Sequence, residues 1–149
     1  MRAVVQRVLH AQVTVDAELT GQIAHGLCVF VGVAVDDAEL DAAALADKVV
    51  GLRIFEDAAG KMNLSLLEVG GALLAVSQFT LLGDVRRGKR PSFTDALEPV
   101  RAEALFAAFC QECRQRGAPV ETGRFRTQMR VSLENDGPVT ILIDTRRAF

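Results

Sequence analysis

The segment that decides the fold is Gly26-Leu27-Cys28-Val29-Phe30-Val31-Gly32-Val33, a nearly continuous apolar run. A run of this kind is typical of a strand that is buried on both faces. The residues before it also predict strands. Arg2–Asp16 alternates valine with polar residues and is interrupted once near His10, and Thr20–Ile23 follows as a short partner strand. The chain up to Val33 is therefore expected to be β-structure.

Two amphipathic helices are expected after this run. The first follows an N-cap signal at Asp36-Asp37 and has apolar residues at helical spacing. These residues are Leu40, Ala43, Ala44, Leu45, Val49 and Leu52. The second helix opens with Pro99, stops at Gly117 and carries one apolar stripe. The stripe consists of Leu105, Phe106, Phe109 and Cys113.

Further strands are expected between and after the helices. They are Arg53–Glu56, Ala72–Phe79, Val120–Thr122, Gln128–Leu133 and Val139–Asp144, the last two joined by a turn over Glu134–Pro138. Two helices among so many strands predict an α/β protein, with a mixed, mostly antiparallel sheet or barrel-like core and the two main helices packed outside it. No repeat or linker divides the chain, so residues 1–149 are expected to form a single domain.

The composition excludes several classes of protein. Of the 149 residues, 50% are hydrophobic and 24% are charged, and the formal net charge is −2 at pH 7. That balance argues against a disordered chain and against a protein that coats nucleic acid. Tryptophan and tyrosine are absent, which argues against a broad surface for stacking bases. No apolar run approaches the length of a membrane span, and an odd number of cysteines is typical of reduced thiols, so a cytoplasmic protein without a membrane partner is expected.

The cysteines and histidines do not form a recognisable chemical motif. Cys110 and Cys113 make a CxxC pair, but late in the second helix and without a second ligand pair at zinc-like spacing, so they are expected in the core. His10 lies at a strand interruption and His25 at a turn, and no GxSxG motif is present. No metal or cofactor is predicted, and an enzyme would be expected to work without a histidine base.

Two neighbouring segments contain candidate functional residues. Ser77-Gln78-Phe79-Thr80-Leu81 places two hydroxyls and an amide where a buried strand meets an irregular loop. These groups could orient a substrate or merely terminate the strand, and a threonine hydroxyl is a weak nucleophile without an adjacent base. The next loop carries Arg86, Arg87, Lys89 and Arg90 with one acid, Asp84. This local charge of about +3 is either a solvated loop or a site for phosphates.

A third segment, Asn135-Asp136-Gly137-Pro138-Val139-Thr140, has the composition of a hairpin turn. Composition alone predicts a trans Gly137–Pro138 bond, because only about 5–6% of such bonds are cis in folded proteins.

Taken together, these motifs resemble the D-aminoacyl-tRNA deacylase family, of the D-tyrosyl-tRNA deacylase type, over nearly the whole chain. The ordered set begins with Met1–Val8 and includes the SQFTL segment 77–81 and the NDGPVT segment 135–140. The other matches are Gly51–Phe55, Gly60–Leu64, Arg90–Phe93, Thr122–Phe125 and Met129. The tail Thr145–Phe149 is a minor departure, and its Arg146-Arg147 pair has no role in the resemblance.

The resemblance implies hydrolysis of the ester that joins a D-amino acid to the 3′-terminal adenosine of tRNA. Glycine mischarged on an alanine tRNA would be removed as well. The family resemblance also implies a homodimer with active sites at the subunit interface. The Gly137–Pro138 bond would be cis, and this dipeptide would reach into the partner's pocket and exclude L-amino acids by steric clash.

The resemblance also assigns individual residues. Ser77, Gln78, Phe79 and Thr80 would form the catalytic segment, with backbone N–H groups near Phe79 and Thr80 binding the oxyanion and the ribose 2′-hydroxyl assisting proton transfer. The substrate-binding residues would be Gly137, Pro138, Phe125, Met129 and Ala102. The tRNA-binding residues would be Arg86, Arg87, Lys89 and Arg90.

Two alternatives remain at this stage. One is a non-catalytic module that binds RNA ends through the Arg86–Arg90 loop. The other is a hydrolase for small esters that uses Thr80 together with His10 or His25.

Overall fold

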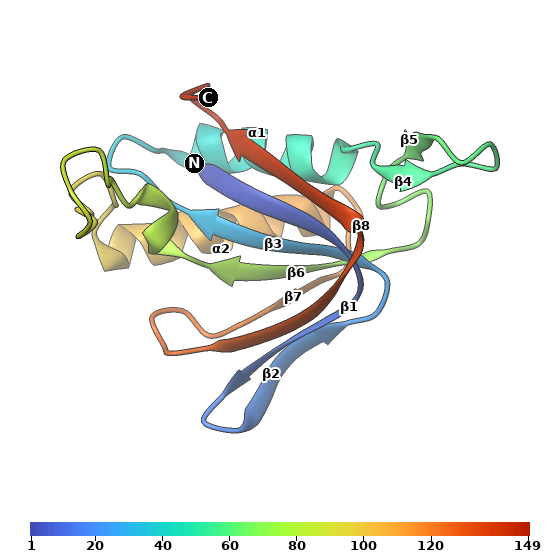
Figure 1. Ribbon diagram of the computed structural model, residues 1–149, viewed down its shortest axis with the longest axis horizontal. Helices are drawn as coiled ribbons and strands as arrows, with labels where there is room; N and C mark the ends of the chain where they lie inside the picture. The colour runs from blue at the N-terminus through green and yellow to red at the C-terminus, as the bar shows by residue number, and fades with distance from the viewer.

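The structure, a computed structural model that describes residues 1–149, contains one six-stranded mixed sheet (Figure 1). Its strands are β1 (Arg2–Val15), β2 (Glu18–Ile23), β3 (Gly26–Gly32), β6 (Ala72–Ser77), β7 (Val120–Thr122) and β8 (Arg130–Asp144). The strand order is β2-β1-β3-β6-β7, and β8 pairs with β1. Strand β1 is antiparallel to β2, β3 and β8, whereas the β3–β6 and β6–β7 pairs are parallel. The predicted mixed, mostly antiparallel sheet is confirmed.

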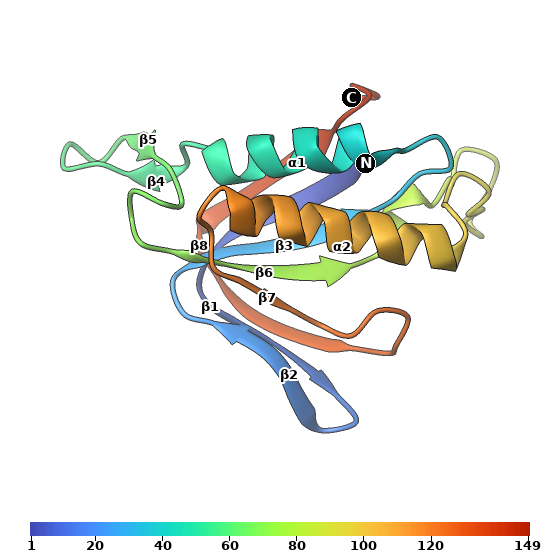
Figure 2. The ribbon, with the colours of Figure 1, turned by 180° about the vertical axis from the view of Figure 1, so that it is seen from behind.

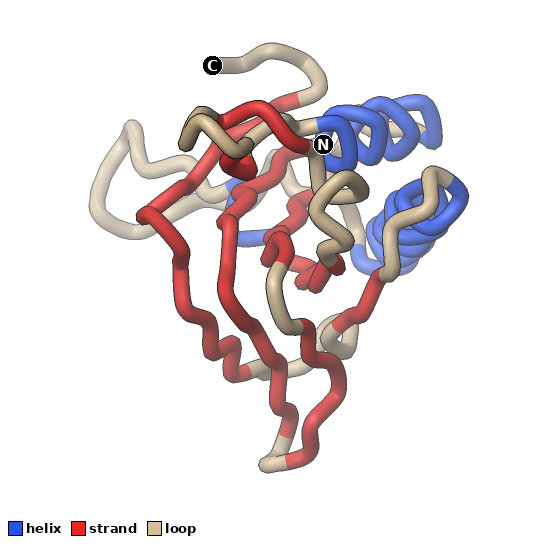
Figure 3. The backbone as a smooth tube through the Cα atoms, turned by 90° about the vertical axis from the view of Figure 1, so that its right-hand side faces the viewer, coloured by secondary structure: helices blue, strands red, loops and turns tan.

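Strand β1 is paired along both of its edges. One edge follows β8 over Arg2–Thr14, and the other follows β3 over Arg2–Val8 and then β2 over Ala11–Val15. The sheet curls strongly (Figure 3). Strand β2 contacts β7 as a result. A Cβ atom on Gly21 of β2 would lie 2.4 Å from the carbonyl oxygen of Thr122, so this approach requires glycine. The sheet is therefore barrel-like and nearly closed.

Helices α1 (Glu39–Gly51) and α2 (Pro99–Gln115) lie side by side over one face of the sheet (Figure 2). A cluster of 26 buried residues fills the space between the helices and the sheet, and a smaller cluster of 7 lies on the concave side. Leu27 and Val29 of β3 belong to the first cluster and Cys28 to the second. This confirms the predicted strand buried on both faces, which ends at Gly32, one residue before the end of the apolar run.

The two helices begin differently. Helix α2 starts at Pro99 as predicted, with the Glu98 carboxylate accepting hydrogen bonds from the first turn. Helix α1 starts at Glu39, and the predicted cap at Asp36-Asp37 is wrong. The Asp37 carboxylate is buried and accepts hydrogen bonds from the Met1 ammonium group at 2.7 Å and from the Ala34 N–H at 2.6 Å, so it is already satisfied.

The carboxyl-terminal strand also differs from the prediction of two strands joined by a hairpin turn. Strand β8 runs without a break from Arg130 to Asp144, and both of its halves pair with β1. The register shifts near Val8, where β8 carries extra residues. The Asn135 side chain bridges these residues by accepting from the Val139 N–H at 2.7 Å and donating to the Val139 carbonyl at 3.0 Å. The segment is a bulge rather than a turn.

Smaller elements complete the structure. Strand β6 ends at Ser77, two residues earlier than predicted, and is followed by a 3₁₀ turn, η1 (Phe79–Leu82). Strands β4 (Phe55–Glu56) and β5 (Met62–Leu64) form a separate two-stranded sheet, of which the sequence patterning predicts only the first strand. Arg146 in the tail contacts Asp36, Asp37 and Asp41, which attaches the carboxyl terminus to the start of α1. Neither helix has the length and apolar character of a membrane span.

Candidate active site

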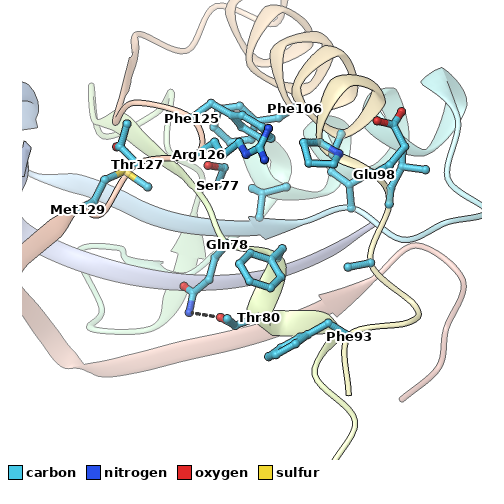
Figure 4. Close-up of a pocket in the computed structure, with 17 residues that line it drawn as sticks. Ser77, Gln78, Thr80, Phe93, Glu98, Phe106, Phe125, Arg126, Thr127 and Met129 are labelled. Atoms are coloured by element: carbon cyan, nitrogen blue, oxygen red, sulfur yellow. Dashed lines mark hydrogen bonds between the residues drawn. The ribbon is translucent and has the colours of Figure 1, made fainter. Parts of the chain in front are cut away.

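A cavity of about 650 Å³ lies between the carboxyl end of β6, the amino-terminal half of α2 and the loop from β7 to β8 (Figure 4). Seven of the nine residues predicted to act on or bind the aminoacyl ester line it. They are Ser77, Gln78, Phe79, Thr80, Ala102, Phe125 and Met129. The fold thus brings together three segments that are far apart in the sequence.

The wall that contains Ser77–Thr80 is held by β3 and by η1. The Gln78 N–H donates to the Val31 carbonyl at 2.8 Å, which continues the β3–β6 pairing by one residue. The Phe79 ring is 59% exposed and meets Phe93 edge-on, with the ring centroids 5.0 Å apart. Because Phe79 and Thr80 open η1, their backbone N–H groups have no partner within this 3₁₀ turn. These two donors lie on the segment that borders the cavity.

The Thr80 hydroxyl has one polar side-chain neighbour. The Gln78 side-chain amide donates to Thr80 Oγ1 at 3.0 Å (Figure 4). An amide cannot remove a proton from a hydroxyl, so this contact orients Thr80 without activating it.

The histidines lie elsewhere, and neither lines the cavity. His10 contacts Glu134 at 3.0 Å on the exposed side of the sheet, and His25 packs edge-on against Phe55 with centroids 5.1 Å apart. The alternative in which Thr80 acts with His10 or His25 is therefore wrong for this structure. His10 lies on β1 and His25 in the turn between β2 and β3, whereas the cavity is lined by residues from the ends of β3 and β6, from α2 and from the β7–β8 loop.

Two charged residues line the cavity, Glu98 and Arg126. The Glu98 carboxylate accepts hydrogen bonds at 2.9 Å from the Val100 and Arg101 N–H groups, so it serves as the cap of α2. Sequence reasoning missed Arg126, although it directly follows Phe125 in a family motif. Its φ of +56° is uncommon for a residue with a side chain and costs about 1–2 kcal/mol. No composition signal reveals such a conformation.

The basic loop lies between η1 and α2, and none of its cations lines the cavity. Arg86 is engaged by Asp84 at 2.7 Å, and hydrogen bonds from Arg86 lower the pKa of the Asp84 carboxyl to about 2. Arg87, Lys89 and Arg90 are exposed and form no ion pair. Of the four cations predicted to bind phosphates, Arg87, Lys89 and Arg90 are therefore free to contact an anionic partner.

Gly137 and Pro138 also lie outside the cavity of their own chain. The bond between them is cis, as the resemblance implies and contrary to the prediction from composition. Gly137 has a φ of +140°, and a Cβ atom there would lie 2.7 Å from Val139 Cγ2, so only glycine fits. The Arg7 guanidinium donates to the Asp136 carbonyl at 3.0 Å and to the Ile54 carbonyl at 2.6 Å. The dipeptide is thus an exposed projection from β8 with a fixed base.

The comparisons with known proteins decide the family. The sequence model of the family described as D-Tyr-tRNA(Tyr) deacylase matches residues 4–144. The chain belongs to this deacylase family. The D-aminoacyl-tRNA deacylases of Anaeromyxobacter dehalogenans and Sorangium cellulosum are 62% and 60% identical to it, with full coverage of both chains in each case. That of Thermotoga petrophila is 58% identical over the same extent. The resemblance inferred from the motifs is confirmed.

Two solved structures share the fold of this deacylase-family chain. One, described as c-Myc DNA Unwinding Element Binding Protein, has 37% identity and a TM-score of 0.91, and the match covers 97% of this chain and 98% of that one. The other, described as a probable eukaryotic D-amino acid tRNA deacylase, has 18% identity and a TM-score of 0.82, with 95% and 97% coverage. The second likeness shows the fold alone.

The three cysteines of this family member are all free and buried, which confirms their predicted place in the core. Burial raises the pKa of Cys110 to about 11 and that of Cys113 to about 12. Thiolates are the reactive form, so the CxxC pair is inert in the folded protein at neutral pH.

We expect iodoacetamide to label none of the three cysteines in the native protein at pH 7.5 within an hour, because burial keeps them protonated and inaccessible. After denaturation in guanidinium chloride, intact mass spectrometry should show three adducts. Rapid labelling of Cys110 or Cys113 in the folded state would contradict this assignment.

Proposed function

We propose that this protein hydrolyses the ester between the 3′-terminal adenosine of tRNA and a D-amino acid or glycine, including glycine mischarged on an alanine tRNA, and that it rejects L-aminoacyl esters. Family membership supports an aminoacyl-tRNA ester hydrolase. The observation that carries the proposal is the cavity, in which Ser77–Thr80 faces an apolar wall without a free titratable base. An activated ester can be hydrolysed in such a site by positioning and charge stabilisation.

The chemical step is proposed as follows. Water attacks the ester carbonyl carbon, and the backbone N–H groups of Phe79 and Thr80 stabilise the oxygen that becomes negative. The bond between the carbonyl carbon and the ribose 3′-oxygen then breaks. The attacking water gives up one proton, which the adjacent ribose 2′-hydroxyl relays to the departing 3′-oxygen. The products are the free amino acid and tRNA with an intact terminal adenosine.

The proposed selectivity acts through the backbone of a second subunit. An enzyme that accepts every D-amino acid cannot recognise one side chain, so it must reject the L-configuration by a steric clash near the α-carbon. The exposed Gly137–Pro138 projection does not reach its own cavity, and we assign it to the cavity of the partner in a homodimer. Two large apolar side chains are exposed on the paired strands β1 and β8: Leu9 on β1 is 48% exposed and Leu142 on β8 is 60% exposed. Their exposure supports an interface on these two strands. Glycine passes because it has no side chain to clash.

The remaining assignments concern the tRNA and its location. We assign Phe125, Met129 and Ala102 to the pocket for the terminal nucleotide and amino acid, since all three line the cavity. The exposed loop is assigned to phosphates of the acceptor end, with Arg87, Lys89 and Arg90 as its free cations and Arg86 paired with Asp84. We place the reaction in the cytoplasm, where charged tRNA is used.

The decisive test compares D- and L-tyrosyl-tRNA as substrates for the purified protein. We expect kcat/KM for the D-ester to exceed that for the L-ester by at least about 100-fold, because a steric clash excludes the L-substituent. Release of the amino acid is followed by acid precipitation of labelled aminoacyl-tRNA. Equal rates would contradict the selectivity, and binding of both without turnover would favour the RNA-end module.

Substitution Thr80→Ala tests the proposed absence of a side-chain nucleophile. We expect kcat to stay within about tenfold of the parent value, since the backbone N–H groups are unaffected. Thr94→Ala, an exposed threonine outside the cavity, is the matched control. A loss of about 10⁴-fold or more with an unchanged melting temperature would show that Thr80 is the nucleophile.

Substitution Pro138→Ala tests the action of the dipeptide across the subunit interface. The change removes a rigid ring that does not touch its own cavity, so we expect the ratio of D- to L-ester hydrolysis to fall at least tenfold. Pro119→Ala, at another exposed proline, should leave the ratio unchanged. Sedimentation equilibrium should give twice the mass of one chain. An unchanged ratio, or a monomer with full activity, would contradict the assignment.

A further inference from the structure

Arg126 is a charged group at the cavity whose presence the proposed chemistry does not explain. The other charged residue of the lining, Glu98, is occupied as the cap of α2. Arg126 forms no ion pair and no side-chain hydrogen bond. Figure 4 shows its guanidinium group on the side of the cavity formed by Phe106 and Phe125. The cavity lining thus contains one exposed, unpaired cation that is accessible to an anionic ligand group.

The local structure holds Arg126 in this position. Its backbone has a φ of +56°, a conformation that glycine adopts far more readily. The preceding Phe125 ring packs beside Phe106 at a centroid distance of 6.3 Å, and the Thr127 hydroxyl donates to the Arg124 carbonyl at 2.8 Å. These contacts on both sides fix the turn. A disfavoured backbone fixed by its neighbours at a cavity is a feature that often serves binding.

Two further arginines lie next to the first cavity, on the side formed by Phe106 and Phe125. A second cavity of about 360 Å³ shares Phe106 and Phe125 with the first and is lined by Arg114 and Arg124. It also contains Glu103, and Arg124 is 3.5 Å from the exposed Glu18 carboxylate, so the positive charge there is partly neutralised. Arg126 lines only the first cavity, where the other charged residue, Glu98, is occupied as the cap of α2.

We infer that Arg126 binds the phosphate on the 5′ side of the terminal adenosine, an inference that rests on the proposed function. The ester to be cleaved is attached to the 3′-oxygen of that ribose, beside Ser77–Thr80. The 5′-phosphate is the one anionic group of the same nucleotide. A guanidinium group donates two parallel hydrogen bonds to phosphate oxygens, which would fix the ribose as well as add affinity.

A pair of ligands that differ only in this phosphate tests the inference. The first is 3′-deoxy-3′-(D-alanylamino)adenosine, a stable amide analogue of the ester, and the second is its 5′-phosphate. Both are titrated by isothermal calorimetry into the parent protein, Arg126→Gly and Arg130→Ala. Glycine suits the backbone of residue 126, so this variant removes the guanidinium without straining the fold. Arg130 is an exposed arginine that lines neither cavity and serves as the matched control.

We expect the 5′-phosphate to tighten binding at least about fivefold in the parent protein and in Arg130→Ala, and less than twofold in Arg126→Gly. A phosphate gain that is absent in the parent, or that persists in Arg126→Gly, would overturn the inference. Equal weakening of both analogues by Arg126→Gly would overturn it too, since it would indicate a general effect on the cavity. Failure of both analogues to bind the parent would instead count against the proposed function, and with it the inference.

Kinetics with D-tyrosyl-tRNA give a second readout. In Arg126→Gly we expect KM to rise several-fold with little change in kcat, and the salt dependence of log(kcat/KM) to weaken by about 0.7 per decade of salt, the value for one phosphate of a single strand. Thermal unfolding of this variant should match the parent within about 3 °C. An unchanged salt dependence would contradict the assignment of Arg126 to a phosphate.

Discussion

The pairing of β1 along both of its edges is the constraint on which the rest of the structure depends. Because β3 and then β2 occupy one edge of β1 while β8 occupies the other, the sheet has to curl. Strand β6 pairs with β3, and this pairing places the carboxyl end of β6 at the cavity. Because β8 stays paired with β1 on both sides of residues 135–139, the extra residues are forced out of the ladder. Arg7 of β1 then holds the base of this bulge. One strand thereby sets the position of both the cavity wall and the Gly137–Pro138 projection.

The residues that line the cavity restrict the possible catalytic mechanisms more strictly than the family membership of the chain does. Thr80 contacts an amide, Glu98 caps a helix, and both histidines lie elsewhere, so the lining offers no side chain suited to remove a proton. The proposed mechanism therefore uses the backbone N–H donors at the start of η1 and the hydroxyl of the substrate's own ribose. Such a site is adequate for an ester, which is already activated, and inadequate for an amide bond. The choice of reaction thus follows from what the cavity lacks as well as from what it contains.

The sequence predicts those features that depend on local patterning. The buried strand β3, the Pro99 helix start and the buried cysteines follow from apolar periodicity and from proline geometry. The motifs also identify seven residues that line the cavity. The misassigned features depend on partners distant in sequence. Asp37 is taken by the Met1 ammonium group, and the bulge at Asn135 keeps β8 continuous only because β1 pairs with both halves. Arg126 escapes prediction because its backbone conformation is set by the packing around Phe125.

The positive charge that matters for the proposed function is concentrated at a few positions of the chain. A net charge of −2 gives no general attraction for RNA, and the proposed contacts with the tRNA end are confined to one cation at the cavity and one basic loop. This arrangement has a kinetic consequence. Under the proposed function, weak affinity for the body of tRNA would allow rapid release of L-aminoacyl-tRNA. A strongly basic surface would instead hold that tRNA as a competitor of the substrate. Mild acidity with local cations therefore fits the proposed selective hydrolysis, because discrimination at the α-carbon is useful only if rejected tRNA leaves quickly.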